Sequence, residues 1–256
     1  MQENLSIVLL EIQLSWEAPQ ANRNSIAQKL ERLSADVDLV VLPEMFTTGF
    51  SMQPEKFAEA MDGETVRWMQ EQAAKYNIAI AGSIAIREKD SFKNRFVFVH
   101  EDGAIDFYDK RHLFGMGGEV AAYTAGKTTG IIEFKGWKVC LRICYDLRFP
   151  AWCRNQSDYD LLLFTANWPN PRIQAWDTLL QARAIENMAY CIGVNRTGTD
   201  PHGNYYPGHS AAYHPLGERI SASSGDWQEV QVSASTLKKL REQLPFLQDR
   251  DSFEME

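Results

Sequence analysis

The sequence predicts a layered α/β domain, in which helices cover the outer faces of β-sheets. Short apolar runs bounded by turn residues alternate with longer stretches that have helical periodicity. Many of these runs are apolar at every position, as expected for strands that are covered on both faces. The expected strands outnumber the helices, and they occur both in hairpins and in βα units. A layered α/β domain fits this mixture best.

The first half of the chain alternates strands with helices and ends in a hairpin. The expected strands are residues 5–13, 37–44 and 78–86, the expected helices are residues 25–35 and 64–77, and the hairpin covers residues 94–110. Asn24 or Ser25 is the expected cap of the first helix, and Asp62 that of the second. The side chains of these residue types accept hydrogen bonds from the free N–H groups of a first turn.

The second half begins with an irregular glycine-rich loop at residues 114–127 and then returns to strands and helices. Strands are expected at residues 130–134, 137–144, 159–167, 191–198 and 229–235, a hairpin at residues 209–223, and helices at residues 175–190 and 237–244. No linker and no internal repeat divides the chain. We therefore expect a single domain over residues 1–256, with residues 244–256 as a C-terminal tail.

Charge and composition argue against several classes of protein. The net charge of -8 and the absence of a basic run disfavour a nucleic-acid partner. Glu11 interrupts the first apolar run, and no basic segment precedes it, so neither a signal peptide nor a membrane span is expected. The cysteines form no CxxC pair and no zinc-site spacing; they are Cys140, Cys144, Cys153 and Cys191. Reduced thiols, a cytoplasmic protein and no metal site are expected.

Four polar residues stand at or just beyond the ends of predicted strands: Glu44, Lys110, Glu119 and Cys144. In open α/β folds such positions carry the reactive groups. A carboxylate can take the proton of a thiol, and a lysine can stabilise the oxyanion that forms when the thiol attacks an acyl carbon. The four residues are thus sufficient for acyl transfer. Each one alone has an ordinary reading, as a buried thiol, a turn residue or a solvated surface charge.

Three motifs carry these residues in a fixed order: "LPEMFTTGF" (42–50), "YDKRHLF" (108–114) and "CYDLRFP" (144–150). They resemble the three signature motifs of the nitrilase (carbon–nitrogen hydrolase) superfamily. "ANWP" (166–169) and "RAIENMAY" (183–190) resemble further blocks of that family, and the resemblance extends to about Val232. Within the superfamily the chain is most similar to the bacterial omega-amidases.

The resemblance implies a nitrilase-like, four-layer αββα sandwich that forms homodimers and uses no metal or organic cofactor. It implies that Cys144 is the nucleophile and that Glu44 takes the thiol proton and passes it to the leaving ammonia. Lys110 and the backbone N–H of Tyr145 would hold the oxyanion. Glu119 would orient Lys110 or the substrate and assist the attack of water.

The resemblance also implies the substrate class, which is the small omega-amides of 2-oxo dicarboxylic acids, namely 2-oxoglutaramate and 2-oxosuccinamate. Arg172 is a candidate for binding the substrate carboxylate, because its guanidinium matches that group in fork geometry. Phe114 and Trp168 are candidates for the pocket wall. The alternatives are another carbon–nitrogen hydrolase (nitrilase, carbamoylase or general aliphatic amidase) and a non-catalytic binding protein.

Two polar residues of the cysteine motif are expected to be structural. Asp146 and Arg148 are expected to form hydrogen bonds that fix the turn after Cys144. Arg142 lies inside a strand expected to be buried, so it requires an acidic partner or a solvent-facing position. His112 is expected to be a packing residue without a chemical role.

Overall fold

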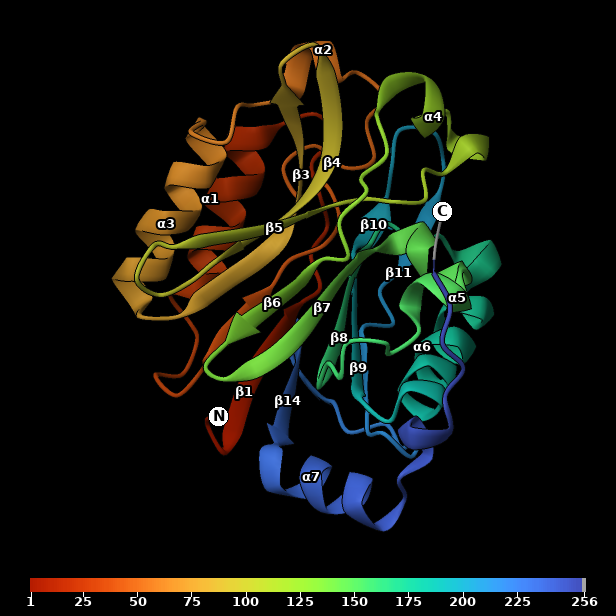
Figure 1. The fold of residues 1–256 in the computed structure, drawn as a ribbon. Coiled ribbons are helices and arrows are strands. Elements are labelled where there is room, and N and C mark those ends of the chain that lie inside the picture. The colour runs from red at the N-terminus through yellow and green to blue at the C-terminus, as the bar shows by residue number, and fades with distance from the viewer. Residues whose placement is uncertain (255–256) are drawn as a thin grey trace.

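The computed structural model describes residues 1–254 and shows two β-sheets packed face to face (Figure 1). Helices α1 (Pro19–Leu30) and α3 (Glu64–Tyr76) cover the outer face of one sheet. Helices α5 (Pro150–Cys153) and α6 (Ile173–Asn187) cover the outer face of the other. The predicted α/β fold with four αββα layers is confirmed.

The first sheet has seven strands in the order β13-β14-β1-β2-β3-β4-β5. Their bounds are β1 (Asn4–Leu10), β2 (Leu39–Val41), β3 (Ala79–Glu88), β4 (Ser91–Val99), β5 (Ile105–Asp109), β13 (Ala222–Ser224) and β14 (Trp227–Ser233). The central strands β1, β2 and β3 are parallel, while antiparallel strands extend the sheet on both sides. The predicted hairpin is present as β4 and β5.

The second sheet has five strands in the order β12-β9-β8-β7-β6. Their bounds are β6 (Ile131–Phe134), β7 (Trp137–Ile143), β8 (Leu161–Ala166), β9 (Tyr190–Asn195) and β12 (Ala211–Tyr213). Strands β7, β8 and β9 are parallel. A short ribbon of β10 (Thr197–Thr199) and β11 (Tyr205–Pro207) follows β9.

The side-chain alternation of each strand divides the apolar core into two parts. On β1, Ile7 and Leu9 belong to the core between the sheets, whereas Val8 and Leu10 belong to the core beneath α1 and α3. Both faces of the central strands are therefore buried, which explains why their sequences are apolar at every position. This packing fixes the two sheets against each other.

The helix starts differ from those predicted. Helix α1 begins at Pro19, after Ala18, so neither Asn24 nor Ser25 is its cap. Proline is favoured at a first helical position because it has no N–H that would be left unbonded. Helix α3 follows Gly63 and has no side-chain cap, so the prediction for Asp62 was also wrong. Helix α7 (Ala234–Gln243) begins earlier than predicted and is capped by the Ser233 side chain.

The predicted hairpin at residues 209–223 forms only in part. Its turn is present, since the His214 N–H donates to the Glu218 carbonyl. The second arm begins to pair, since Arg219 bridges Tyr213 and the Ile220 N–H donates to the Ala212 carbonyl. The chain then leaves β12, and β13 pairs with β14 of the other sheet. The predicted loop at residues 114–127 contains two short helices, η1 (Gly115–Gly117) and α4 (Glu119–Ala122). Another short helix, α2 (Pro54–Phe57), was not predicted.

The C-terminal tail packs against the chain's own surface near α5. After helix η4 (Phe246–Asp249), Gln156 Nε2 donates to the Asp251 carbonyl, and Arg250 forms an ion pair with Asp158. Residues 255–256 of the predicted tail lie outside the described residues. Within residues 1–254, no helix has the length and apolar character needed to cross a membrane.

Candidate active site

The predicted site residues lie at one end of the sandwich, where strands from both sheets finish. Glu44 follows β2 and Lys110 follows β5, both in the first sheet. Cys144 follows β7 in the second sheet. Between the sheets, the Thr165 hydroxyl donates to the Leu42 carbonyl at 2.7 Å. The site is therefore assembled across the interface of the two sheets.

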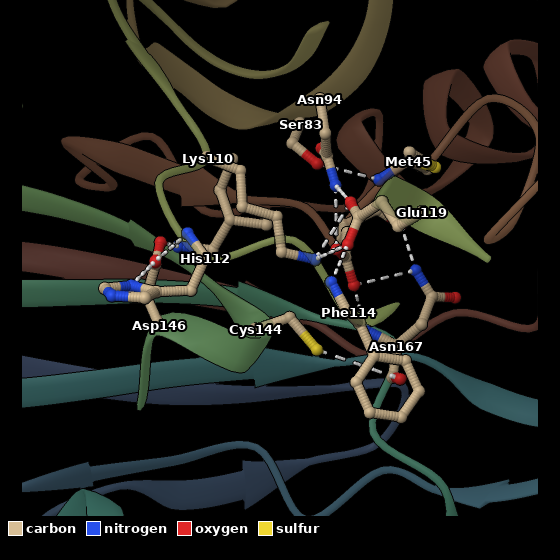
Figure 2. Close-up of polar contacts among 12 residues, drawn as sticks. Met45, Ser83, Asn94, Lys110, His112, Phe114, Glu119, Cys144, Asp146 and Asn167 are labelled. Atoms are coloured by element: carbon tan, nitrogen blue, oxygen red, sulfur yellow. Dashed lines mark hydrogen bonds and ion pairs between the residues drawn. The ribbon is translucent and has the colours of Figure 1, made fainter. Parts of the chain in front are cut away.

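Lys110 occupies the centre of a buried polar cluster (Figure 2). Its Nζ lies 2.8 Å from Glu44 Oε1 and 2.8 Å from Glu119 Oε2, and none of the three side chains is exposed. An ammonium has three protons, and Nζ also lies 3.1 Å from Glu119 Oε1, so all three are directed at carboxylate oxygens. The 3.1 Å contact is the longest of the three, and a substrate oxygen can replace it. The structure thus brings together three of the predicted residues.

Asn94 connects the two carboxylates of this cluster and was not predicted. Its Nδ2 donates to Glu44 Oε1 and to Glu119 Oε1, at 2.9 Å each. The backbone N–H of Asn167 donates to Glu44 Oε2 at 2.9 Å. The backbone N–H of Phe114 donates to Glu119 Oε2 at 2.6 Å. These neutral donors stabilise two buried negative charges that a single lysine cannot balance.

The protonation of the cluster follows from its burial and its charges. Burial raises the pKa of Glu119, and the negative charge of Glu44 raises it further, whereas Lys110 lowers it. Burial by itself would lower the pKa of Lys110, but the charges of Glu119 and Glu44 outweigh burial and raise it. Lys110 is consequently a permanent cation. A proton added to the cluster is held by a carboxylate.

Cys144 begins a 3₁₀ helix, η2 (Cys144–Arg148), directly at the end of β7. Its φ of 45° is left-handed, a conformation that non-glycine residues adopt at a cost and that is concentrated at functional sites. Its Sγ lies 3.9 Å from the Asn167 carbonyl. The N–H of Tyr145 stands in the first turn of η2, where N–H groups have no acceptor within the helix. It is therefore suited to bind an oxyanion.

The Cys144 side chain is a thiol in the resting site. Burial and the negative charge of Glu44 raise the pKa of Cys144 well above its usual value, and Lys110 offsets this only in part. The thiol therefore needs a base that removes its proton during attack. Burial also raises the pKa of Cys140 to about 11 and that of Cys153 to about 12. Those two thiols and Cys191 are fully buried, as expected for structural cysteines.

A cavity of about 610 Å³ opens beside Cys144. Its walls include the predicted pocket residues and several that were not predicted; they are Phe114, Tyr145, Arg148, Asn167, Trp168, Arg172 and Tyr206. The guanidinium of Arg148 lies 5.0 Å from the Trp168 ring centroid, and that of Arg172 lies 5.4 Å from the Phe114 ring centroid. Neither arginine forms an ion pair within the described chain. Both charges remain available to an anionic ligand.

The arginines of the cysteine motif differ from the predictions. Asp146 accepts hydrogen bonds from Ile143 N, Tyr108 Oη and His112, as expected of a residue that fixes the turn. Arg148 does not share this role and faces the cavity instead. Arg142 is buried without a direct carboxylate partner among residues 1–254. It donates to the carbonyls of Thr129, Leu141 and Trp152, and its guanidinium lies over the rings of Tyr108 and Trp152.

Asn94 and Asn167 were not predicted as site residues, and the reason differs between them. Asn94 precedes the apolar run of β4, and Asn167 stands in "ANWP" after β8. Asn94 lies within β4, and only the pairing of β4 with β5 places it beside Lys110. Asn167 could have been found from its motif, since it occupies the same strand-end position as Cys144 in the neighbouring strand.

Comparison with known proteins identifies the family to which this chain is similar. The family model described as carbon–nitrogen hydrolase matches residues 8–243. The chain is 43% identical to omega-amidase YafV of Escherichia coli K12, over 98% of both chains. It is 32% identical to the 2-oxoglutaramate amidase of Bacillus subtilis, over 95% of this chain and 96% of that one.

A solved structure agrees with these sequence matches. XC1258 from Xanthomonas campestris, a CN-hydrolase superfamily protein, superposes with a TM-score of 0.95 and 41% identity, and all of each chain is covered. The chain therefore belongs to the carbon–nitrogen hydrolase family, in the nitrilase superfamily, as a relative of the YafV omega-amidases.

Proposed function

We propose that this protein is an omega-amidase that hydrolyses 2-oxoglutaramate and 2-oxosuccinamate to the corresponding acids and ammonia. The relatives named omega-amidase YafV and 2-oxoglutaramate amidase support this substrate class. The observation that carries the proposal is the set of residues that line one cavity. It joins the Cys144 thiol to the guanidinium groups of Arg148 and Arg172, neither of which has an ion-pair partner among residues 1–254.

The first half-reaction forms a thioester. The Cys144 sulfur attacks the amide carbon while Glu44 takes the thiol proton. The carbonyl electrons move to oxygen, and the oxyanion is held by the Lys110 ammonium and by the Tyr145 N–H. The carbon–nitrogen bond then breaks as Glu44 returns the proton to nitrogen, and ammonia leaves.

The second half-reaction consumes water. Glu44 takes a proton from water as its oxygen attacks the thioester carbon, and Lys110 and Tyr145 again hold the oxyanion. The carbon–sulfur bond breaks, the acid leaves, and Cys144 regains its proton from Glu44. Glu119 holds Lys110 in place throughout, through the 2.8 Å contact.

The arginines explain a preference for acidic amides. A guanidinium binds a carboxylate through charge-assisted hydrogen bonds, and Arg148 and Arg172 border the same cavity as Cys144. The thiol would attack the uncharged amide end of the substrate while the arginines hold the carboxylate end. The guanidinium groups of Arg148 and Arg172 lie over the rings of Trp168 and Phe114, and both rings border the same cavity.

The test is ammonia release from 2-oxoglutaramate by the purified protein, with glutamine and an aliphatic nitrile as competing substrates. Ammonia from the 2-oxo amide, absent in a Cys144→Ser variant, supports both the nucleophile and the substrate class. Faster turnover of the nitrile or of an uncharged amide would overturn the substrate class. Homodimer formation and the single-domain assignment of residues 1–256 stay predictions, which sedimentation and limited proteolysis would test.

A further inference from the structure

We infer that Asp146 is a positioning residue that sets the distance and direction between Lys110 and Cys144. The two residues follow strands of different sheets, β5 and β7, so no strand pairing fixes one against the other. The inference rests on the proposed function, because it assigns Asp146 a part in the same acyl transfer. The inferred role of Asp146 extends from the turn after Cys144 to the segment that carries Lys110.

The Asp146 carboxylate binds both catalytic segments at once. Its Oδ2 accepts from the Ile143 N–H at 3.0 Å, one residue before Cys144. The same oxygen accepts from the Tyr108 hydroxyl at 2.8 Å, two residues before Lys110. Its Oδ1 accepts from the backbone N–H of His112 at 3.0 Å, two residues after Lys110. Lys110 is thus flanked on both sides by residues that are bonded to the Cys144 turn.

The His112 ring strengthens the same connection (Figure 2). Its Nδ1 lies 2.8 Å from Asp146 Oδ1. The ring also stacks on Phe149, at 3.6 Å between centroids and with 6° between the planes. Phe149 directly follows η2, so these two contacts of the ring come from the Cys144 segment. His112 therefore has a role that goes beyond packing.

The Tyr108 hydroxyl adds a further link. It accepts from Trp152 Nε1 at 2.9 Å and from the Arg111 N–H at 3.1 Å. Asp146 itself is fully buried. A buried carboxylate with four donors has little freedom to move, so the segments that supply the donors are held with it. Positioning of this kind affects rate strongly, since a misplacement of ~1 Å can cost about 10²-fold.

The test compares His112→Ala, His112→Asn and Tyr108→Phe, with Asp106→Asn as the matched control. Asp106 also stands on β5 and pairs with a histidine, His100, at 2.8 Å, but neither residue lines the cavity. We expect His112→Ala and Tyr108→Phe to lower kcat for 2-oxoglutaramate by roughly 10–100-fold, with KM changed by less than about 3-fold. His112→Asn, whose amide can replace the Nδ1 donor, should recover most of the rate. The control should stay within about 2-fold of the unaltered protein.

The decisive readout is the pH dependence of Cys144 alkylation by iodoacetamide, which requires no substrate. Lys110 favours the thiolate, so its displacement should move the alkylation curve to higher pH. Removal of a negative charge alone would move the curve to lower pH. In Asp146→Asn the direction of the shift therefore distinguishes the two effects. A shift to higher pH indicates loss of positioning, and a shift to lower pH indicates loss of charge alone.

Each outcome decides the inference. A lower kcat with the curve moved to higher pH supports it. Unchanged kcat and an unchanged curve in folded His112→Ala and Tyr108→Phe proteins, with only the melting temperature reduced, would overturn it. If the unaltered protein hydrolyses no omega-amide but the curve still moves to higher pH in the variants, the positioning role stands and the proposed function fails.

Discussion

The Lys110 ammonium lies 2.8 Å from Glu44 Oε1, and neither side chain has any contact with solvent. With Glu119, the cluster holds two carboxylates and one ammonium. Loss of the Cys144 proton to solvent would add a second excess negative charge to this buried site. We therefore propose that the thiol proton moves to Glu44 only when substrate carbon is attacked, by general-base catalysis and not from a preformed thiolate.

A Glu44→Gln variant should separate catalysis from thiol reactivity. Hydrolysis should fall by about 10²–10⁴-fold, because the base is lost. Glu44 is also the charge that most raises the pKa of Cys144, so its removal should shift the iodoacetamide alkylation curve to lower pH. The alkylation rate at neutral pH should therefore rise while turnover falls. Ammonia release and mass-spectrometric labelling check the two effects.

Lys110→Met should shift the alkylation curve of Cys144 in the opposite direction from Glu44→Gln. It removes the oxyanion ligand, so kcat should fall by about 10²–10³-fold. It also removes the positive charge that lowers the pKa of Cys144, so the alkylation curve should move to higher pH. Curves that move in the same direction in Glu44→Gln and Lys110→Met would contradict the electrostatic account of this site.

Asn94 should be required for full activity although no reaction step uses it. Asn94→Ser removes the donor shared by Glu44 and Glu119, and we expect kcat to fall by roughly 10-fold. Asn94→Asp should be worse, because it places a third carboxylate in the buried cluster. Steady-state kinetics and urea unfolding measure both variants, with Ser91→Ala on the same strand as the control. Equal activities for Asn94→Ser and the control would exclude the role.

The two arginines should determine selectivity for acidic amides. Arg148→Gln and Arg172→Gln should each raise KM for 2-oxoglutaramate by roughly 10–100-fold, since each charge-assisted hydrogen bond contributes about 1.5–3 kcal/mol. KM for the uncharged pentanamide should change by less than about 3-fold. If only one variant responds, that arginine binds the carboxylate. Equal losses on both substrates would show that the arginines act on the shape of the pocket and not on charge.

The fold and the central site residues were predictable because each is marked by local sequence. Apolar runs without alternation predict buried strands, and Glu44 and Cys144 each follow such a run, whereas Lys110 follows the second strand of the predicted hairpin. The motifs that carry them occur in the sequence in the same order as the strands β2, β5 and β7 that they follow. Glu119 was placed in a loop and lies at the start of the four-residue helix α4, a difference that leaves its carboxylate directed at Lys110.

The remaining features depend on pairings that are distant in sequence. Asn94 reaches the site only through the register of β4 against β5. Arg148 was expected to bond the turn, but Asp146 and Phe149 already hold that turn, so the arginine faces the cavity. The end of the predicted hairpin at residues 209–223 pairs with β14, because that pairing extends the other sheet. No local sequence pattern predicts the position of Asn94, the direction of Arg148 or the strand pairing after residue 220.

The buried thiols should make the protein sensitive to alkali. Burial raises the pKa of Cys140 from 9.0 to about 11 and that of Cys153 from 9.0 to about 12. Above pH 9 the unfolded chain loses these protons while the folded chain keeps them, so the free energy of unfolding falls as pH rises. Each thiol should remove about 1.4 kcal/mol between pH 8 and pH 10, and the full stability is present below pH 8. Urea unfolding under reducing conditions at both pH values measures the loss, and Cys153→Ala should lose less by the contribution of one thiol. An identical loss in that variant would show that other groups, such as the buried tyrosines, cause the sensitivity.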